Sequence, residues 1–139
     1  MRGKTRRLAY ATLLPQLAAI AMAFAPNPAS ADQLCGRQFE SLSQLYADLR
    51  SEANSGGEAS SAWRVLERST HVTFVHGQMI WTFARESQPS FPAAACLQIV
   101  PVEGGIKANV ETRCEGAKDA CDAVATKANG KDWSNLFGD

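Results

Sequence analysis

Hydrophobic residues recur at helical spacing near both ends of the chain. From Gln38 to Ala53, steps of three and four residues place five apolar side chains on one helix face: Phe39, Leu42, Leu45, Tyr46 and Leu49. Residues Asn54-Ser55-Gly56-Gly57 should end this helix, because they tolerate a left-handed backbone. A second helix is predicted from Ala117 to Ala128, where small residues share one face, and Asn129-Gly130 ends it.

Alternating segments between these helices predict two β-hairpins. From Thr70 to Arg85, a two-residue loop at Gly77-Gln78 puts glycine first, as a type II′ turn requires. One face then carries the larger apolar residues, with His76 at its turn end: Val72, Phe74, Met79, Trp81 and Phe83. A three-residue loop would place Trp81 beside Thr73, so the clustering of aromatic residues favours the shorter loop.

The second hairpin is expected to turn at Gly104-Gly105, with Glu103 opposite Ile106. The strand after this turn alternates apolar and polar residues, which predicts that one of its sides faces water. In this register one face carries Leu97, Ile99, Pro101, Ile106, Ala108, Val110, Thr112 and Cys114, and the other carries Cys96, Gln98, Val100 and Val102 with Lys107, Asn109, Glu111 and Arg113. The prolines of Glu86–Pro92 make that segment a connection.

The segment from Glu58 to Arg68 fits either a helix or a strand. A strand from about Trp63 is favoured, because it leads directly into β-rich sequence. The whole pattern predicts an α+β fold with an N-terminal helix, a four- or five-stranded antiparallel meander built from two hairpins, and a C-terminal helix.

The start of the chain has the features of a secretory signal peptide. Basic residues from Arg2 to Arg7 precede an apolar run from Leu8 to Ala25, and small residues stand at Ala29 and Ala31. The run is interrupted by Pro15 and falls short of the roughly 20 residues that span a membrane. We therefore expect residues 1–31 to be a signal peptide, with the general export route favoured over the twin-arginine route, and residues 32–139 to form a single domain in the periplasm or outside the cell.

Charge changes the expected partners once the leader is set aside. The chain holds 14 basic and 14 acidic residues, and the first 31 residues contain four of the basic and none of the acidic ones. The remainder therefore has a net charge of 10 − 14 = −4. An acidic domain of this size is a poor candidate for binding nucleic acid, and no stable membrane insertion is expected after cleavage.

Four cysteines in an exported chain predict two disulfides. Cys96 and Cys114 point to opposite faces of the second hairpin, which disfavours a bond between them. Cys114 and Cys121 flank a short loop, so we predict Cys114–Cys121 and Cys35–Cys96. A Cys-x-x-Cys redox motif and the closer cysteine and histidine spacing of a zinc site are both absent from the sequence.

Part of the chain resembles a group of small exported bacterial proteins of unassigned function. The likeness runs from Trp81 to Val124 and rests on Trp81-Thr82-Phe83-Ala84, the proline-containing link, Ala95-Cys96, the Gly-Gly hairpin, and Arg113-Cys114 followed by Cys121-Asp122. The resemblance implies export and a disulfide-supported α+β domain. It carries over no catalytic residue.

Catalytic patterns are missing from the sequence. It contains no serine in a nucleophile elbow, no glycine-rich phosphate loop and no His-Glu-x-x-His, and nothing selects a catalytic pair among its carboxylates. His71 and His76 face opposite ways on one strand, so they cannot share a metal unless the strand bulges. We expect no catalytic residues, no metal and no cofactor; the prediction leans against an enzyme.

Aromatic residues on the proline-flanked loop and in the tail are the remaining functional signal. Phe91 on the Pro89–Pro92 loop and Trp133 and Phe137 in the tail are the residue types that anchor protein interfaces. They predict an exported binding or interaction protein that modulates or inhibits a partner protein. The alternative is a carrier of a small apolar ligand, or a small enzyme, with a pocket between the first helix and the sheet that includes His71 and Trp81. A further alternative is that the loop and the tail fold back to cover the sheet. Oligomeric state is left open.

Overall fold

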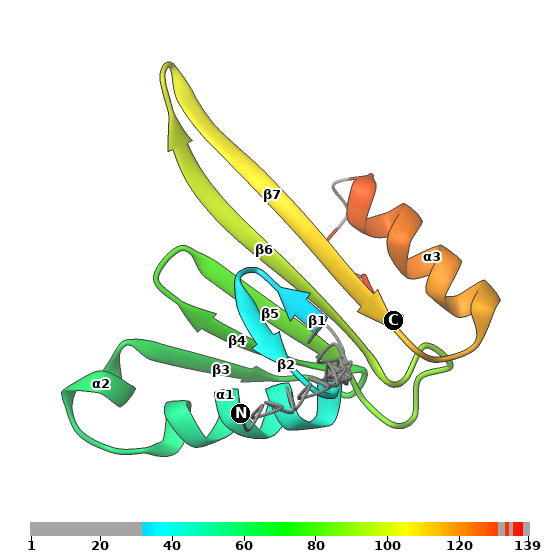
Figure 1. Ribbon diagram of the computed structural model, residues 1–139, viewed down its shortest axis with the longest axis horizontal. Helices are drawn as coiled ribbons and strands as arrows, with labels where there is room; N and C mark the ends of the chain where they lie inside the picture. Colours follow the sequence, from blue (N-terminus) through cyan, green and yellow to red (C-terminus); the bar gives the residue numbers. More distant parts are fainter. Residues whose placement is uncertain (1–31, 131–132, 134, 138–139) are drawn as a thin grey trace, which may run out of the picture.

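A twisted antiparallel sheet of five strands organises the computed structural model of this protein (Figure 1). The structure describes residues 32–130, 133 and 135–137; the predicted signal peptide lies outside them. The strand order β3-β4-β5-β6-β7 follows the chain as a meander, and a separate two-stranded hairpin, β1-β2, precedes it. The strands are β1 (Asp32–Leu34), β2 (Arg37–Phe39), β3 (Trp63–Glu67), β4 (His71–His76), β5 (Met79–Ala84), β6 (Ala93–Val102) and β7 (Gly105–Cys114).

The first predicted hairpin is confirmed in turn and register. His76 faces Met79, Phe74 faces Trp81 and Val72 faces Phe83 across β4 and β5. Gly77 has a φ of 57°, the left-handed backbone that made glycine the expected first residue of the turn.

The predicted turn of the second hairpin is wrong by one residue. The turn is Glu103-Gly104, Gly105 already pairs with Val102, and Ile106 faces Pro101 instead of Glu103. Of the turn residues only Gly104, at φ 85°, needs a left-handed backbone, so Gly105 is free to begin the strand. The side chains still divide between the two faces as predicted, because the pairing moved by two residues and a strand repeats every two.

The ambiguous segment contains both of its candidate elements. A single helical turn, α2 (Glu58–Ser61), is followed by β3, which begins at Trp63 as favoured. The first long helix, α1 (Leu42–Asn54), begins four residues later than Gln38 because residues 37–39 pair with β1 instead. Ser41 caps α1, its hydroxyl accepting a hydrogen bond from the Gln44 amide at 3.1 Å. The last helix is α3 (Lys118–Asn129), and Gly130 ends it.

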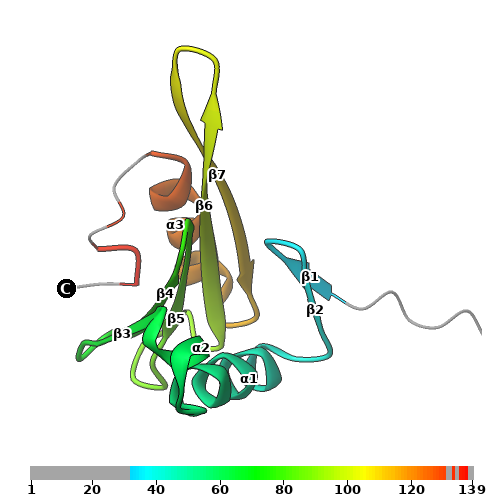
Figure 2. The same cartoon turned by 90° about the vertical axis from the view of Figure 1, so that its left-hand side faces the viewer.

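The sheet has two differently covered faces, which Figure 2 separates. Helix α1 and the β1-β2 hairpin lie against one face, here called the α1 face, and α3 lies against the other, the α3 face. The α1 face buries Leu34, Phe39, Leu42, Leu45, Leu49, Val72, Phe74, Trp81, Phe83, Ala94 and Cys96. The α3 face buries Ala84, Ala93, Ala95, Val124, Ala128, Leu136 and Phe137.

Both predicted disulfides are present. Cys35–Cys96 joins the β1-β2 turn to the α1 face of β6, and Cys114–Cys121 joins the end of β7 to α3. Of the cysteines, none is free.

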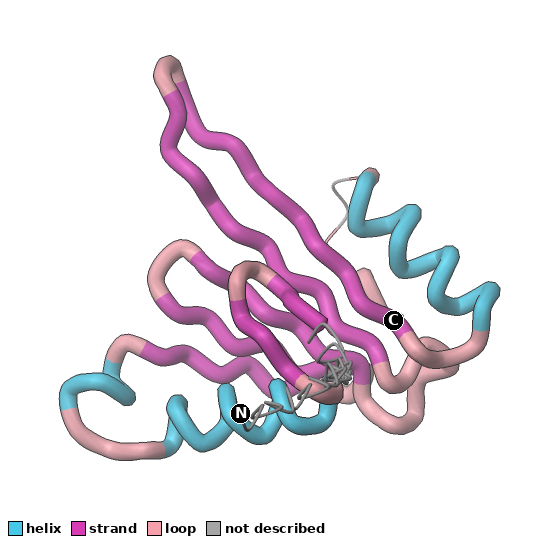
Figure 3. Tube along the Cα trace, in the orientation of Figure 1, coloured by secondary structure: helices cyan, strands magenta, loops and turns pink. Residues whose placement is uncertain are grey.

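Strands β6 and β7 extend well past the rest of the sheet as a two-stranded ribbon (Figure 3). The pairing of β5 with β6 stops at Gln98, whereas β6 and β7 stay paired as far as Val102 and Gly105. Ile106, near the tip, is 76% exposed, the most of any large hydrophobic side chain in the described part of the chain.

Candidate functional site

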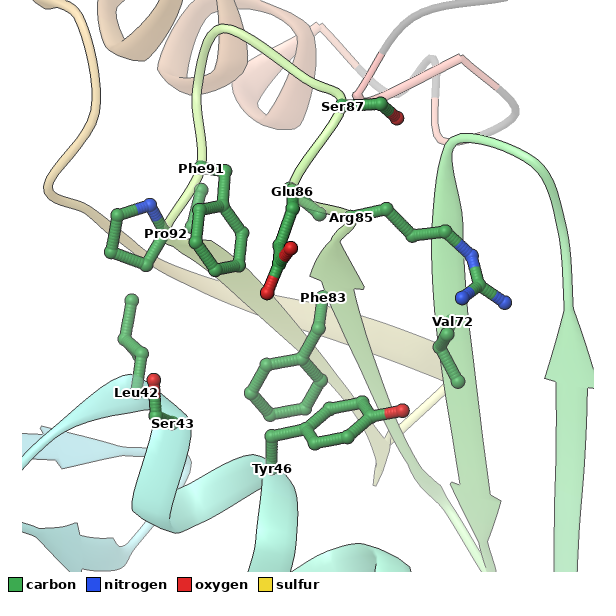
Figure 4. A pocket seen from close by; sticks show the side chains of 12 residues that line it. Leu42, Ser43, Tyr46, Val72, Phe83, Arg85, Glu86, Ser87, Phe91 and Pro92 are labelled. Atoms are coloured by element: carbon green, nitrogen blue, oxygen red, sulfur yellow. The ribbon is translucent and has the colours of Figure 1, made fainter.

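A cavity of about 600 Å³ opens between α1, the end of β5 and the proline-containing connection (Figure 4). Its walls come from Leu42, Ser43, Tyr46, Val72, Phe83, Ala84, Arg85, Glu86, Ser87, Phe91, Pro92 and Ala93. The cavity lies between the first helix and the sheet, where the alternative prediction expected a pocket. Its volume falls in the range of small-molecule and side-chain binding sites, about 300–1,000 Å³.

Aromatic rings line this cavity at different depths. Phe83 forms part of the floor and is almost fully buried, while Tyr46 on α1 meets Phe83 edge to face with ring centroids 5.4 Å apart. Phe91 lies at the rim, 37% exposed, and its ring faces the cavity in Figure 4. The aromatic wall is therefore buried at Phe83 and accessible at Phe91.

The charges beside the cavity are arranged asymmetrically. Glu86 extends its carboxylate into the space between the rings of Phe91 and Phe83, and no hydrogen bond or ion pair joins that carboxylate to another described residue (Figure 4). The guanidinium of Arg85 points away from the cavity, where its Nη2 donates to Glu67 and its Nε donates to the Arg68 carbonyl at 2.6 Å. Arg50 and Arg85 together hold the pKa of Glu67 below its ordinary value. The negative charge of Glu86 is therefore the one that faces the cavity without a partner.

The loop that carries Phe91 is held in place by backbone contacts with the segment before α3. The Ala117 amide donates to the Pro89 carbonyl at 3.1 Å, and the Glu115 amide donates to the Pro92 carbonyl at 2.8 Å. Gly116 lies under Ser90, whose backbone comes within 2.4 Å of the position that a Cβ on Gly116 would take. Any larger residue at position 116 would displace the loop. Gly116 therefore helps to set the position of the cavity rim, although it lies far from Phe91 along the chain.

His71 and Trp81, the residues expected in the pocket, are not among those that line the cavity. Trp81 is 1% exposed within the α1 face, and its indole nitrogen has no hydrogen-bond partner. His71 accepts or donates a hydrogen bond at Nδ1 with the Thr70 hydroxyl at 2.9 Å, and burial lowers its pKa. The structure therefore does not bring these two residues together with the aromatic wall.

The residues proposed for partner contact are separated. Phe91 lies at the rim of the cavity, whereas Phe137 is 5% exposed within the α3 face, as the alternative of a tail folded over the sheet expected. Trp133 is partly buried beside a shallow groove between the β6-β7 ribbon and the end of α3, which Leu97, Ile99, Ile106, Val110 and Ala128 also line.

The described ranges contain no group of three or more His, Cys, Asp or Glu side chains that could hold a metal ion. In the same residues no helix has the length and apolar character needed to cross a membrane. Comparison of the chain with protein-family models, with curated proteins and with solved structures finds no match.

Two lining residues carried no functional signal in the sequence. Tyr46 fits the apolar face of α1 and was expected to be core, and Glu86 is one of several polar residues in a connection. Both line the cavity because the end of β5 lies near α1 in the fold, and no local pattern encodes that long-range arrangement.

Proposed function

We propose that this protein is an exported binding protein whose cavity beside α1 receives a basic side chain of a partner protein. The observation that carries the proposal is the unpaired Glu86 carboxylate set between aromatic rings in an open cavity. Aromatic faces and a carboxylate together favour an ammonium or guanidinium group, through cation–π attraction and a charge-assisted hydrogen bond.

The form of the site supports a protein partner. Phe91 is exposed on a loop anchored by backbone hydrogen bonds, so it loses little conformational freedom when it is covered. Aromatic residues presented in this way are the usual anchors of protein interfaces. The net charge of −4 after residue 31 adds long-range attraction for a basic partner.

The chemistry of the cavity can be tested without knowing the partner. Purified, oxidised protein is titrated with an alkylguanidinium and with the alkyl carboxylate of the same length, and binding is followed by chemical-shift changes. We expect the guanidinium alone to perturb the residues that line the cavity. Glu86→Lys and Phe91→Ala should each weaken its binding by about tenfold or more, since each removes one of the two recognition elements.

Matched controls come from exposed residues elsewhere. Leu66→Ala removes an apolar side chain of similar exposure, 42%, and Glu103→Lys makes the same charge change at the hairpin turn. Both should leave binding unchanged. Equal binding of cation and carboxylate, or equal losses in the controls, would contradict the proposal. Recovery of partner proteins with the wild type and not with Glu86→Lys extends the test to the natural ligand.

The size of the cavity favours one second candidate, a carrier of a small apolar ligand. Native mass spectrometry of the purified protein distinguishes the two functions. A bound small molecule that is retained by Glu86→Lys and lost in Phe91→Ala would support the carrier and count against the basic partner.

A further inference from the structure

Strand β7 forms one edge of the sheet, and its outer backbone groups have no strand partner. The Ile99 amide donates to the Gln78 carbonyl at 2.9 Å, so the odd-numbered residues of β6 turn their backbone groups toward β5 and the even-numbered ones toward β7. In the observed register, the outward-pointing amides and carbonyls of β7 therefore belong to its even-numbered residues, from Ile106 to Cys114. Among the described residues only the Thr112 carbonyl is engaged, by the side chain of Arg113 at 2.9 Å.

The two open edges of the β6-β7 ribbon differ in their protection. On the β6 side, the residue after Ile99 whose backbone points outward is Pro101. Proline has no amide hydrogen, so it cannot donate a hydrogen bond to an added strand. The outer edge of β7 contains no proline in ten residues. The ribbon is thus closed to strand addition along β6 and open to it along β7.

Charges along β7 are complementary to the same strand reversed. We propose that β7 pairs antiparallel with β7 of a second copy of this chain, about a twofold axis at Asn109. In that register Lys107 faces Glu111 of the second copy, and Glu111 faces its Lys107. Ala108 faces Val110, and Ile106 faces Thr112. Lysine on an edge strand ordinarily discourages pairing, but here each lysine meets a carboxylate.

Backbone geometry and side-chain charge together select this register over its neighbours. Outward groups belong to even-numbered residues, so even must pair with even, and those pairs exchange two hydrogen bonds each. Lys107 and Glu111 then form non-hydrogen-bonded pairs, in which side chains approach most closely. In the two adjacent registers Lys107 would face either Asn109, without a charge pair, or Arg113, with repulsion.

Glu111 is already oriented for this contact. Its Oε2 accepts a hydrogen bond from the Cys35 amide at 2.7 Å, and the Cys35–Cys96 disulfide fixes that amide relative to β6. Its other oxygen has no partner among the described residues, so it can accept from a lysine. Helix α3 packs on one face of β7 and β1-β2 contacts the other (Figure 2), so a second strand would add in the plane of the sheet. Pairing would also cover part of the exposed Ile106 side chain.

The test is the oligomeric state of the purified, oxidised protein, measured by sedimentation over a range of concentrations. We expect a concentration-dependent dimer that Lys107→Glu weakens by about tenfold or more, because two attractive pairs become repulsive. Glu111→Lys should do the same, and the double variant should restore the dimer to within about threefold, because the pairs are reversed and not removed. Arg64→Glu is the matched control: it makes the same charge change on the exposed face of β3, the opposite edge, and should have no effect.

The backbone is tested separately. Ala108→Pro removes one outward amide and should abolish the dimer while circular dichroism and intact disulfides show a folded monomer. Monomer at every concentration, a dimer indifferent to Lys107→Glu, or a double variant as weak as the single ones would overturn the proposal. If Glu111→Lys disturbs folding through the lost Cys35 contact, Lys107→Glu and Ala108→Pro still decide it. Phe91→Ala should leave the dimer intact, so failure here is distinct from failure of the cavity proposal.

Discussion

On the α1 face of the sheet, large aromatic side chains from neighbouring strands pack under a helix and a hairpin, whereas the α3 face is closed mainly by alanines under a single helix. Phe74 meets both Tyr46 and Phe83 edge to face, with centroids 5.5 and 5.9 Å apart. Ala84, Ala93 and Ala95 occupy the corresponding strands on the other side. Because buried area sets the hydrophobic free energy, the α1 face should contribute most of the stability.

The ion pairs and disulfides that stabilise the two faces also differ. On the α1 face, Arg37 forms a two-pronged ion pair with Glu52, at 2.5 and 2.7 Å, and Arg50 joins α1 to Glu67 on β3 at 2.6 Å. Within the described residues of the α3 face, the ion pair joins Lys118 and Asp122, which are both exposed on one helix. The disulfide on the α1 face spans 61 residues and the one on the α3 face spans 7. Fewer long-range ion pairs and a shorter disulfide loop therefore hold the α3 face, and the α1 face holds the sheet together.

Truncation of one buried side chain in each face is the strongest test of whether the α1 face contributes more stability than the α3 face. Phe74→Ala removes a fully buried ring at the centre of the α1 face and should lower the free energy of unfolding by about 3–5 kcal/mol. Val124→Ala removes two methyl groups beneath α3 and should cost about 1–2 kcal/mol. Urea unfolding of both variants measures the difference. A loss for Val124→Ala as large as that for Phe74→Ala would show that the faces contribute equally.

Removing one disulfide at a time gives the next contrast. In the chain-entropy estimate, a closed loop of 61 residues stabilises by about 4 kcal/mol and one of 7 residues by about 2.5 kcal/mol. Replacing Cys35 and Cys96 together by alanine should therefore destabilise more than the same change at Cys114 and Cys121. Thermal and urea unfolding of the two double variants test this order. The reverse order would mean that the short loop organises more of the fold than its length implies.

The sequence predicts the faces of the sheet well because strand alternation and turn chemistry are local. The opposite directions of Cys96 and Cys114 excluded one of the three possible pairings, and the short loop between Cys114 and Cys121 selected the correct one of the remaining two. The position of the second turn was missed because Gly104 and Gly105 suit a turn equally well in sequence, and only one of them takes the left-handed backbone. Strands β1 and β2 were missed because three residues are too few to show an alternation.

The sequence predicts where the cavity lies but not which residues line it. The alternative prediction expected a pocket between the first helix and the sheet, and the cavity lies there. The sequence does not predict that Phe91 lines this cavity, because Phe91 lies on a loop that packs closely on Gly116, more than twenty residues away along the chain. The alternative prediction places Trp81 in the pocket, yet it lies deeper, in the core of the α1 face.

The smallest expected effect is the contribution of Glu52, on the α1 face, to the pH dependence of the unfolding free energy. Hydrogen bonds from Arg37 lower the pKa of Glu52 in the folded protein below its ordinary value of 4.5. The unfolded chain then binds more protons in the acid range, so this stabilisation is complete above about pH 5 and is lost as the pH falls through the folded pKa. Both side chains are more than a third exposed, at 34% and 43%, so screening limits the contribution to a few tenths of a kcal/mol.

Unfolding free energies of the wild type and of Glu52→Gln, measured between pH 3 and pH 7, isolate this contribution. The variant should lose a small part of the acid slope and show its deficit only at the upper end of the range. Arg37→Gln should flatten the slope to the same extent, and the double variant should add little more, because both changes remove one interaction. A deficit for Glu52→Gln that does not shrink as the pH falls would assign the effect to packing between β2 and α1, since protonation of Glu52 removes the charge pair.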